Sequence, residues 1–520
     1  MHMDLLSTVD WSRAQFALTA MYHWLFVPLT IGLSLIVAIM ETIYYRTGDE
    51  RWKGLTKFWM TLFGINFAIG VATGLILEFE FGTNWSNYSW FVGDIFGAPL
   101  AIEGIFAFFL EATFVAVMFF GWKKVSPGFH LAATWLTAFG VALSAWWILV
   151  ANAWMQYPVG MEFDPDQMRN VMTDFSAVAL SPVAVNKFFH AVFSTWTLAG
   201  VFVAGVSAWM LWRKRNVEAS RLSLRIASWV GLAGILLTLW TGDGSAVNVA
   251  KVQPMKLAAM EGLYDGKVGQ ELVGFGFVNT DKRPGDSLPA IKAEISIPYG
   301  LSVLANHDPH SFVPGINDLI EGVSLTPQGD TVNTVSYAER IRMGRTAREA
   351  LAEYGQARQA GDEAAAAAAL KTVRENYRYF GYGYFDNPED AVPPVAMTFY
   401  SFRVMVVTGG YLLLLFIALV FISYRKTSLL ERSWLHWLCI ISIPLVWICS
   451  QAGWVLAEVG RQPWTIQDLL PVQAAVSAIP ADNVVLTFCL FAVLFTMLLA
   501  AEISIMLRYI SRKSKTDIMA

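Results

Sequence analysis

Charged residues and cysteines are scarce in this sequence. Only 15% of the 520 residues are charged and 55% are hydrophobic, which is more apolar surface than a soluble core can bury. The net charge is −4 and no dense basic face is evident, which excludes a nucleic-acid-binding protein. The three cysteines, Cys439, Cys449 and Cys489, lie in apolar runs without CxxC spacing, so they cannot build a zinc or iron–sulfur site. We expect them to pack as small hydrophobic residues.

The start of the chain lacks the basic residues that open a cleaved signal peptide. The acidic residues Asp4 and Asp10 stand there instead, so we expect the first apolar helix to remain in the protein. The sequence also lacks an internal repeat of the kind that builds transporters from inverted halves.

Long apolar runs are what the sequence has in abundance. A membrane-spanning helix needs about 20 such residues, and nine runs meet this length. They lie near residues 15–45, 58–80, 98–122, 129–150, 188–212, 222–242, 398–424, 433–457 and 484–507. The sequence therefore predicts an all-α integral membrane protein with nine transmembrane helices.

Basic residues in the short loops predict the direction of these helices. Lysine and arginine are retained on the inner side of a membrane, and here they cluster in every second loop. The clusters are Arg46, Arg51, Lys53 and Lys57; Lys123 and Lys124; Arg213, Lys214, Arg215 and Arg221; Arg425, Lys426 and Arg432; and Arg508, Arg512, Lys513 and Lys515. We therefore expect an outer N-terminus and an inner C-terminus. Helices one to six occupy residues 1–242, a large polar outer region occupies 243–397, and residues 398–520 hold helices seven to nine with an inner tail.

Several titratable side chains fall inside the predicted spans, where they are costly and usually functional. They are His23, Glu103, Glu111, His130, His190 and His436. With the predicted orientation, His23, His190, Met405 and Glu458 lie in the outer half of the membrane on four different helices. Histidine and methionine are established iron ligands in haem proteins, so this set favours axial haem ligation over a single-metal site.

Simpler interpretations of these residues stay open at this point. A histidine at a helix end can be a hydrogen-bonded interface residue, and Met405 can be a core filler. His130 and His436 lie near the inner boundary, where they can contact lipid headgroups. Glu103 and Glu111 are about 12 Å apart along one helix, and they either transfer protons or form structural hydrogen bonds.

Eight segments resemble subunit I of the cytochrome bd ubiquinol oxidases, and the resemblance covers essentially the whole chain. The segments are RAQFALTAMYHWLFVPLTIG from Arg13, KFWMTLFGINFAIGVATGLILEFEFGTNW from Lys57, VGDIFGAPLAIEGIFAFFLEATF from Val92, WILVANAWMQYP around Asn152, KFFH at His190, QPMKLAAMEG around Lys256, FRVMV at Met405 and GWVLAEVGRQPW from Gly453. The outer region is long, which resembles the members with an extended Q-loop.

The resemblance implies three haems. His190 and Met405 match the two axial ligands of the low-spin haem b558. His23 and Glu458 each match a ligand of haem b595 or haem d, and the residues alone do not decide which. Arg403 is expected to stabilise a haem propionate or the bound quinol, and Arg461 is expected to pair with Glu458 or a propionate.

The resemblance also implies a reaction with a direction across the membrane. The region 243–397 corresponds to the Q-loop, where Lys256 and Glu261 match the pair that contacts quinol. Quinol is oxidised at the outer face and oxygen is reduced to water with protons from the cytoplasm, through His130, Glu111 and Glu103. This builds a membrane potential without pumping. The implied partners are subunit II and a small single-span subunit in a bacterial inner membrane.

Two departures from some relatives touch the proton route, Ala112 after Glu111 and Gln451 in place of an acid. Two other functions remain as alternatives. A transporter would use Glu103 and Glu111 to bind a cation, but this does not explain the outer-half ligand set. A di-haem electron-transfer subunit that never binds oxygen does not explain a third haem-ligand position.

Overall fold

The computed structural model describes residues 7–325, 330–425 and 427–519. Within these residues, nine helices are long and apolar enough to cross a membrane, which confirms the predicted number. They are Thr8–Thr47, Glu50–Thr83, Asp94–Phe120, Pro127–Gln156, Phe175–Trp212, Val217–Val252, Pro388–Arg425, Ser433–Val459 and Ala481–Lys513. The sixth helix continues to Val252, so the following extramembrane region begins ten residues later than residue 243.

Four of these spans are single α-helices in the first two-thirds of the chain, α1 (Thr8–Thr47), α2 (Glu50–Thr83), α6 (Pro127–Gln156) and α9 (Val217–Val252). The third span contains α4 (Asp94–Ile102), a π-helix η1 (Glu103–Phe108) and α5 (Phe109–Phe120). The fifth contains α7 (Phe175–Ala179) and α8 (Pro182–Trp212), and the seventh contains η3 (Pro388–Ala391) and α15 (Val395–Arg425). The last two spans are α16 (Ser433–Val459) and α18 (Ala481–Lys513).

The helix ends follow from local sequence. Ser126 and Ser181 cap α6 and α8 by accepting a backbone N–H in the first turn, and each is followed by proline at the first helical position. Gly48 ends α1 in the left-handed conformation, with φ of +67°.

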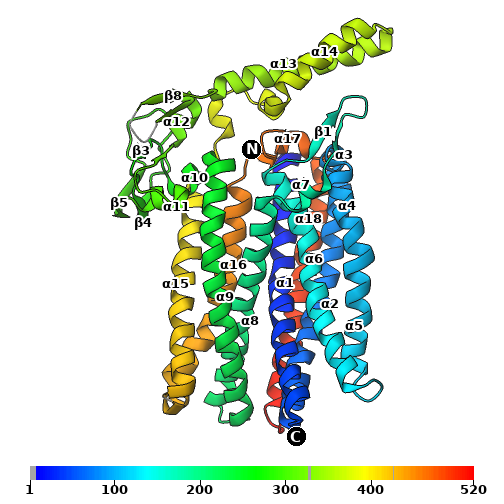
Figure 1. Cartoon of the computed structure of the whole chain (residues 1–520), viewed down its shortest axis with the longest axis vertical. Coiled ribbons are helices and arrows are strands. Elements are labelled where there is room, and N and C mark those ends of the chain that lie inside the picture. The colour runs from blue at the N-terminus through cyan, green and yellow to red at the C-terminus, as the bar shows by residue number, and fades with distance from the viewer. Residues whose placement is uncertain (1–6, 326–329, 426, 520) are drawn as a thin grey trace.

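The spans form two neighbouring groups of helices. Helix α8 packs against α9 and α16, and α15 packs against the same two helices, so α8 and α15 lie diagonally across a four-helix group. Helices α1, α2, α5, α6 and α18 form the other group, which contacts the first through α1 and α6 against α8 (Figure 1). A diagonal pair leaves space at the centre of a four-helix group, where such bundles place their cofactors.

Close helix contacts depend on small residues, as is usual in membranes. A Cβ atom at Gly200 of α8 would lie 2.8 Å from the Cα atom of Gly231 on α9, so the two backbones touch. Around this contact, Leu33, Trp59 and Phe416 belong to one large buried apolar cluster.

The segment 253–387 forms an extramembrane region at one end of the bundle (Figure 1). Its helical elements are α10 (Pro254–Glu261), α11 (Gly300–Asn306), α12 (Ile316–Glu321), α13 (Tyr337–Ala360), α14 (Glu363–Asn376) and η2 (Tyr377–Tyr384). Its strands are β3 (Lys267–Val268), β4 (Leu272–Val278), β5 (Ile291–Ile297), β6 (Phe312–Val313), β7 (Val323–Leu325) and β8 (Thr331–Asn333). They pair as the antiparallel ladders β3–β6, β4–β5 and β7–β8.

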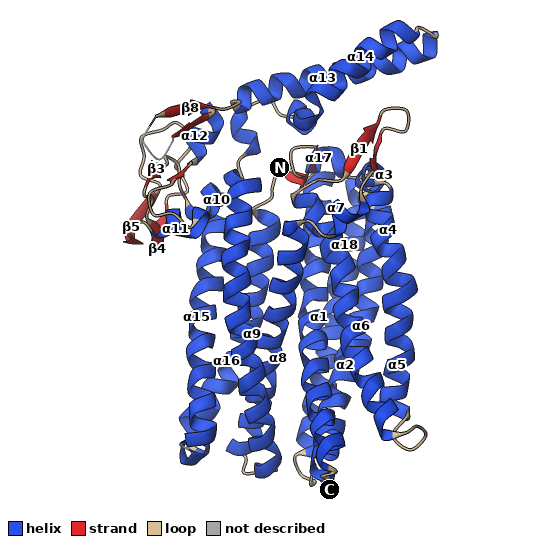
Figure 2. Ribbon diagram, viewed as in Figure 1, coloured by secondary structure: helices blue, strands red, loops and turns tan. Residues whose placement is uncertain are grey.

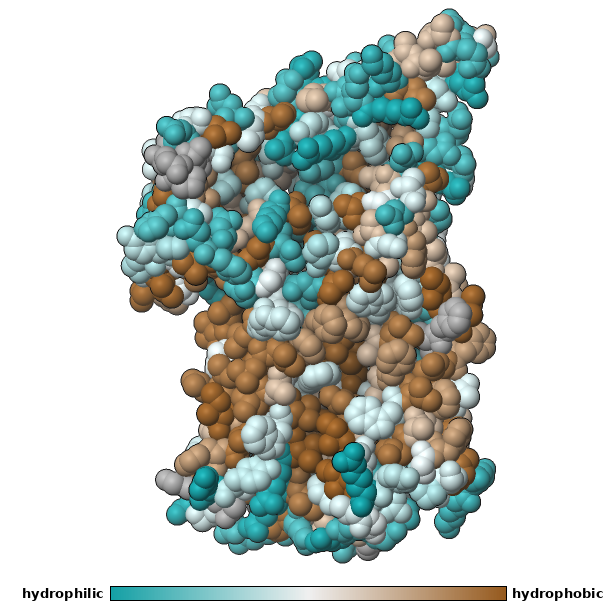
Figure 3. Space-filling view, in the orientation of Figure 1, coloured by the Kyte–Doolittle hydropathy of each residue, from teal (hydrophilic) through white to brown (hydrophobic). Residues whose placement is uncertain are grey.

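Short elements complete the connections between spans (Figure 2). They are α3 (Ser86–Val92), β1 (Met161–Asp164), β2 (Arg169–Met172), η4 (Thr427–Glu431), β9 (Trp464–Ile466), β10 (Leu470–Pro471) and α17 (Val472–Ala475). The start of α1 lies at the same end of the bundle as the extramembrane region, and the C-terminal end lies at the opposite end. On the face shown in Figure 3, a hydrophobic band crosses the helices between two hydrophilic ends, as a membrane protein requires.

Candidate functional site

His23 and Glu458 line one cavity of about 940 Å³, which lies between α1, α2, α6, α16 and the third span. Glu103, Glu111 and Arg461 line the same cavity. The structure therefore brings together five of the predicted site residues, which come from three separate spans and the loop after α16. The volume is at the upper end of the range for ligand pockets, which is about 300–1,000 Å³.

His23 is held so that one ring nitrogen is left for a ligand. Its Nδ1 atom lies 3.0 Å from the Thr73 hydroxyl on α2, which leaves Nε2 as the atom that can bind iron. A Cβ atom at Gly74 would lie only 3.0 Å from Cε1 of the His23 ring. Glycine at this position therefore gives the imidazole its space.

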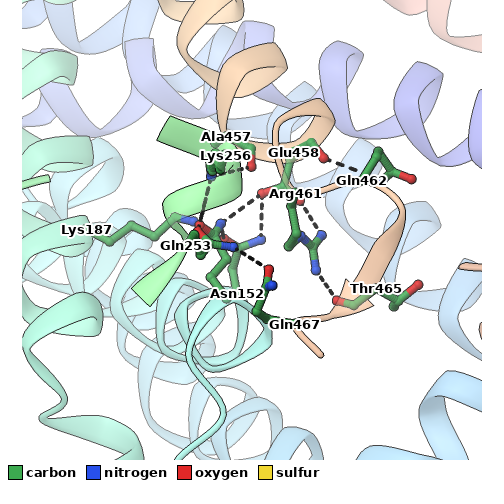
Figure 4. A network of polar contacts seen from close by, with 11 residues as sticks. Asn152, Lys187, Gln253, Lys256, Ala457, Glu458, Arg461, Gln462, Thr465 and Gln467 are labelled. Atoms are coloured by element: carbon green, nitrogen blue, oxygen red, sulfur yellow. Dashed lines mark hydrogen bonds and ion pairs between the residues drawn. The ribbon is translucent and has the colours of Figure 1, made fainter. Parts of the chain in front are cut away.

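Glu458 lies in a polar network at the ends of α6, α8 and α16 that are nearest the extramembrane region (Figure 4). Its Oε1 atom accepts a hydrogen bond of 3.1 Å from Asn152, and its Oε2 atom accepts one from Arg461. Arg461 also donates to the carbonyl of Thr465. Arg461 and Glu458 thus form an ion pair, which is one of the two pairings expected for Arg461.

The network contains more cations than anions. Lys187 donates to the side-chain oxygen of Asn152, and Lys256 donates to the Ala457 carbonyl at 2.8 Å (Figure 4). With Arg461 these lysines give three basic groups around one carboxylate, Glu458. Burial, together with the neighbouring Lys187, lowers the pKa of Lys256 to about 7. A buried excess of positive charge favours binding of an anionic group, such as the propionates of a haem.

His190 and Met405 lie on the diagonal helices α8 and α15 of the four-helix group. The Nδ1 atom of His190 is 3.1 Å from the Thr241 hydroxyl, so its Nε2 atom can bind a metal. A Cβ atom at Gly242 would lie 3.5 Å from the His190 ring, and one at Gly453 would lie 3.3 Å from the sulfur of Met405. Gly453 thus keeps space beside the Met405 sulfur, whereas a Cβ atom at Gly242 would make only an ordinary contact with His190. The donor set of His190 and Met405 fits a haem.

Glu261 and Arg403 form a buried ion pair between α10 and α15. The Nη2 atom of Arg403 donates to Oε2 of Glu261 at 2.6 Å and to the Val273 carbonyl at 2.7 Å. Arg403 also lies over the ring of Phe399, 3.6 Å from its centroid. Burial raises the pKa of Glu261 to about 7, although Arg403 opposes this shift.

One oxygen of this pair has no partner among the described residues. Oε1 of Glu261 is buried without a hydrogen bond, and so is Nε of Arg403. Buried polar atoms are normally satisfied, so these two atoms indicate a place for a polar ligand.

Lys256 and Glu261 do not meet in the structure, although the resemblance implied a pair in one quinol site. Both are buried on α10, but Lys256 extends to α16 and Glu261 extends to α15. Five residues on a helix correspond to about 1.4 turns, so the two side chains leave α10 in different directions.

Glu103 and Glu111 both face the cavity. Glu103 accepts a hydrogen bond of 2.5 Å from Ser144, whereas one carboxylate oxygen of Glu111 is buried without a partner among the described residues.

His130 and His436 do not contact headgroups, which corrects that interpretation for both. Nδ1 of His130 lies 2.6 Å from Oε1 of Glu41, and the residue is buried. His436 is buried too, and its Nε2 atom lies 2.6 Å from the Leu430 carbonyl. His130 is part of a small cluster, because Thr134 donates to the other oxygen of Glu41 at 2.6 Å.

Sequence reasoning missed three ionisable residues that the structure places at or near the site: Glu41, Glu78 and Lys187. Glu41 lies inside the first apolar run and pairs with His130, Glu78 lines the cavity, and Lys187 joins the Glu458 network. Each is an ionisable residue within or just before a predicted span. Ionisable residues in a span are usually functional, and this rule, which was applied to Glu103, would also have identified these three.

Comparison with known proteins identifies the family. The family model described as cytochrome bd terminal oxidase subunit I matches residues 11–514. Subunit 1 of cytochrome bd-II ubiquinol oxidase from Escherichia coli K12 is 41% identical, and the match covers 96% of this chain and 96% of the relative. Subunit 1 of cytochrome bd ubiquinol oxidase from Bacillus subtilis 168 is 34% identical, with 98% of this chain and 95% of the relative covered. The bd oxidase structure from Geobacillus thermodenitrificans has a TM-score of 0.77 at 25% identity and covers 97% of this chain and 98% of that chain. This chain belongs to the cytochrome bd terminal oxidase subunit I family.

Proposed function

We propose that this chain oxidises quinol between α10 and α15 and reduces oxygen at the cavity that contains His23 and Glu458. As a member of its family, it is the haem-bearing subunit of a quinol:oxygen oxidoreductase in a bacterial inner membrane, and it acts with subunit II. Transport by Glu103 and Glu111 has no support from its relatives. The proposal goes further than the family assignment in four respects: the identity of the cofactors, the quinol site, the proton route and a small single-span subunit.

Each haem has its own proposed ligands. His190 and Met405, on the diagonal helices of the four-helix group, would hold haem b558. His23 and Glu458, which line the shared cavity, would each hold one of haems b595 and d. When bound, the haems supply one-electron transfer and an iron atom that binds oxygen.

The residues around Glu458 stabilise the charges of these groups. Arg461 and Lys187 lie on two sides of the carboxylate network, and both can pair with haem propionates. Asn152 fixes Glu458 by a hydrogen bond to one of its oxygens. A carboxylate that is oriented in this way keeps its position when a metal is bound.

Glu261 acts as the base that accepts a proton from quinol. Its unpartnered oxygen Oε1 is the observation on which the quinol site rests. Arg403 orients the carboxylate through the other oxygen and can also contact a quinol oxygen. A pKa near 7 suits a group that must take up and release protons at neutral pH. Lys256 extends from the opposite side of α10, where it ties the quinol-binding helix to α16 beside Glu458.

Protons for water formation come from the inner side, past His130, Glu111 and Glu103. The pair of His130 and Glu41 lies nearest the inner boundary, and the two glutamates in the third span face the cavity. Because quinol releases its protons at the outer side, the reaction separates charge and builds a membrane potential without a pump.

The test compares Glu261→Gln with Glu271→Gln in the complete purified complex. Glu271 is a partly exposed residue of the same extramembrane region, paired with Lys267. We expect Glu261→Gln to lower quinol oxidation by about 10²–10⁴-fold, the usual contribution of a positioned base. Its haem spectrum and its oxygen consumption with an artificial one-electron donor should stay unchanged, and so should all properties of Glu271→Gln. Full quinol oxidation by Glu261→Gln would disprove this site.

A further inference from the structure

The β4–β5 hairpin (residues 272–297) exposes a set of large apolar side chains. Phe275, Phe277, Ile295 and Ile297 are 53%, 55%, 68% and 56% exposed. The two phenylalanine rings contact each other edge to face, with centroids 5.3 Å apart, and Phe275 is paired with Ile295 across the ladder. A contiguous apolar patch of this kind on a polar domain marks an interaction surface.

The backbone of the hairpin sets which side chains face outward. The register between the strands shifts, and Ala293 in β5 adopts a positive φ of +50°. A bulge of this kind reverses the alternation of side chains along a strand. Ile291 therefore faces the protein, beside Gly262 and Gly276, whereas Ile295 and Ile297 face away from it.

The other side of the hairpin is fixed to α15. The Tyr400 hydroxyl accepts a hydrogen bond of 3.0 Å from the backbone N–H of Val278, at the end of β4. At the start of β4, the Val273 carbonyl accepts a hydrogen bond from Arg403, which also binds Glu261. The hairpin is therefore attached directly to the proposed quinol site.

The point of attachment lies at the level of the outer headgroups. The inner end of α15 is Arg425, in a basic loop. About 20 helical residues cross the hydrocarbon core, which brings its outer boundary to the neighbourhood of Met405. Arg403 and Tyr400 lie about 3 to 8 Å farther out at 1.5 Å per residue. This distance falls within the interfacial layer of the bilayer.

The apolar patch is also close to the lipid-facing surface of α15. Tyr400, Val404 and Val407 of this helix are all exposed. β4 and β5 lie at the lower edge of the extramembrane region, beside the outer part of α15 (Figure 1), and hydrophobic surface is visible at this edge (Figure 3).

We propose that the β4–β5 hairpin is a lipid anchor, which inserts Phe275, Phe277, Ile295 and Ile297 into the interfacial layer of the outer leaflet. It holds Arg403 and Glu261 at the depth from which a lipid-dissolved substrate arrives. This second part rests on the proposed function, because it takes quinol as the substrate of that site. Apolar and aromatic side chains of this type are the ones that bind at membrane interfaces.

Nitroxide labels test the location of the hairpin. The complete complex, with Cys489→Ser to remove an exposed native thiol, is reconstituted in lipid nanodiscs and labelled at Ile295→Cys or at Val332→Cys. Val332 is a matched control, because it is an exposed apolar residue of β8 in the same region, at 45% exposure. We expect the label at 295 to be relaxed more by oxygen, which concentrates in lipid, than by a water-soluble nickel chelate. The label at 332 should show the reverse.

Two results would overturn the anchor. One is a label at 295 with the same water exposure as the label at 332. The other is a label at 295 that is shielded from both reagents, because a protein partner then covers the patch. The labelling result does not depend on quinol oxidation. The anchor can therefore be disproved while the proposed function holds, and the proposed function can be disproved while the labelling supports the anchor.

Substrate kinetics test the second part. We expect Phe277→Ser with Ile295→Ser to raise KM for a long-chain quinol several-fold in nanodiscs. KM for a short-chain, water-soluble quinol, kcat and the haem spectra should not change. An equal KM increase for both quinols, or none for either, would contradict a role of the anchor in substrate access.

Discussion

At the scale of single residues, the proposed haem ligands His23, His190 and Met405 depend on neighbouring residues. Each neighbour either forms a hydrogen bond to the ligand or is small enough to leave space for it. Thr73 fixes the His23 ring and Thr241 fixes the His190 ring, each through Nδ1. Gly74 and Gly453 leave space beside His23 and Met405. These threonines and glycines do not themselves bind a haem, so only the folded structure reveals their role.

Replacing Met405 by leucine should change the low-spin haem selectively. Leucine has a similar volume, so the helix packing should be kept at a cost below about 1.5 kcal/mol, but it has no atom that binds iron. We expect the visible spectrum of the purified complex to lose the low-spin bands, with the bands of the other haems retained. Met210→Leu on α8, a buried residue of the large apolar cluster, is the control. A normal low-spin spectrum in Met405→Leu would contradict the ligand assignment.

The rate of quinol oxidation should follow the protonation of Glu261. Its pKa is about 7, so the carboxyl is neutral below this pH and is a charged base above it. The rate should therefore rise with pH and reach half of its limit near pH 7. Arg403 lowers this pKa, so Arg403→Leu should move the midpoint to higher pH as well as lowering the rate.

The pH profile of quinol oxidation, measured with the haem spectrum as a control, checks this. A midpoint that moves to lower pH in Arg403→Leu would show that another group controls the rate.

At the scale of helices, the packing of α2 against α1 determines whether His23 can bind a haem. A side chain at Gly74 would meet the His23 ring, whereas a Cβ atom at Gly82, two turns farther along α2, would meet nothing within 4 Å. The two glycines therefore provide a matched pair of substitutions on one helix.

Gly74→Val should displace His23 and lower the content of the haem that it holds. The overpacking should cost about 1–3 kcal/mol, which the complex should tolerate. Gly82→Val should leave the haem content and oxidase activity unchanged. Haem extraction and visible spectra of both variants are the measurement, and a full haem complement in Gly74→Val would show that His23 is not a ligand.

At the scale of the whole molecule, the distribution of basic residues predicts the orientation of the bundle in the membrane. The extramembrane region and the loop at Lys123 and Lys124 lie at opposite ends of the bundle (Figure 1). The charge rule then places the extramembrane region outside and this loop inside.

Cysteine labelling in spheroplasts, which are cells without their outer membrane and wall but with an intact inner membrane, checks the orientation. Lys371→Cys on α14 and Lys124→Cys both replace exposed lysines. A membrane-impermeant maleimide should label position 371 in intact spheroplasts and position 124 only after the membrane is opened. The opposite pattern would reverse the direction of both quinol oxidation and proton uptake.

The sequence by itself determined the number of spans, the family and the identity of the candidate ligands. Long apolar runs in lipid must be helical, because every backbone polar group needs an internal partner there. Motifs such as GWVLAEVGRQPW keep their residues in order along the chain, so they can be recognised without a structure.

Only the tertiary structure decided which side chains meet. It separated Lys256 from Glu261, paired Glu261 with Arg403, buried His130 against Glu41 and attached the β4–β5 hairpin to α15. Most of these contacts join segments that are far apart in the chain. Lys256 and Glu261 are close in the chain, and they are separated because their side chains leave α10 in different directions. Neither hydrophobicity nor spacing specifies how helices rotate against one another, because in lipid this rotation is set by the close packing of side chains.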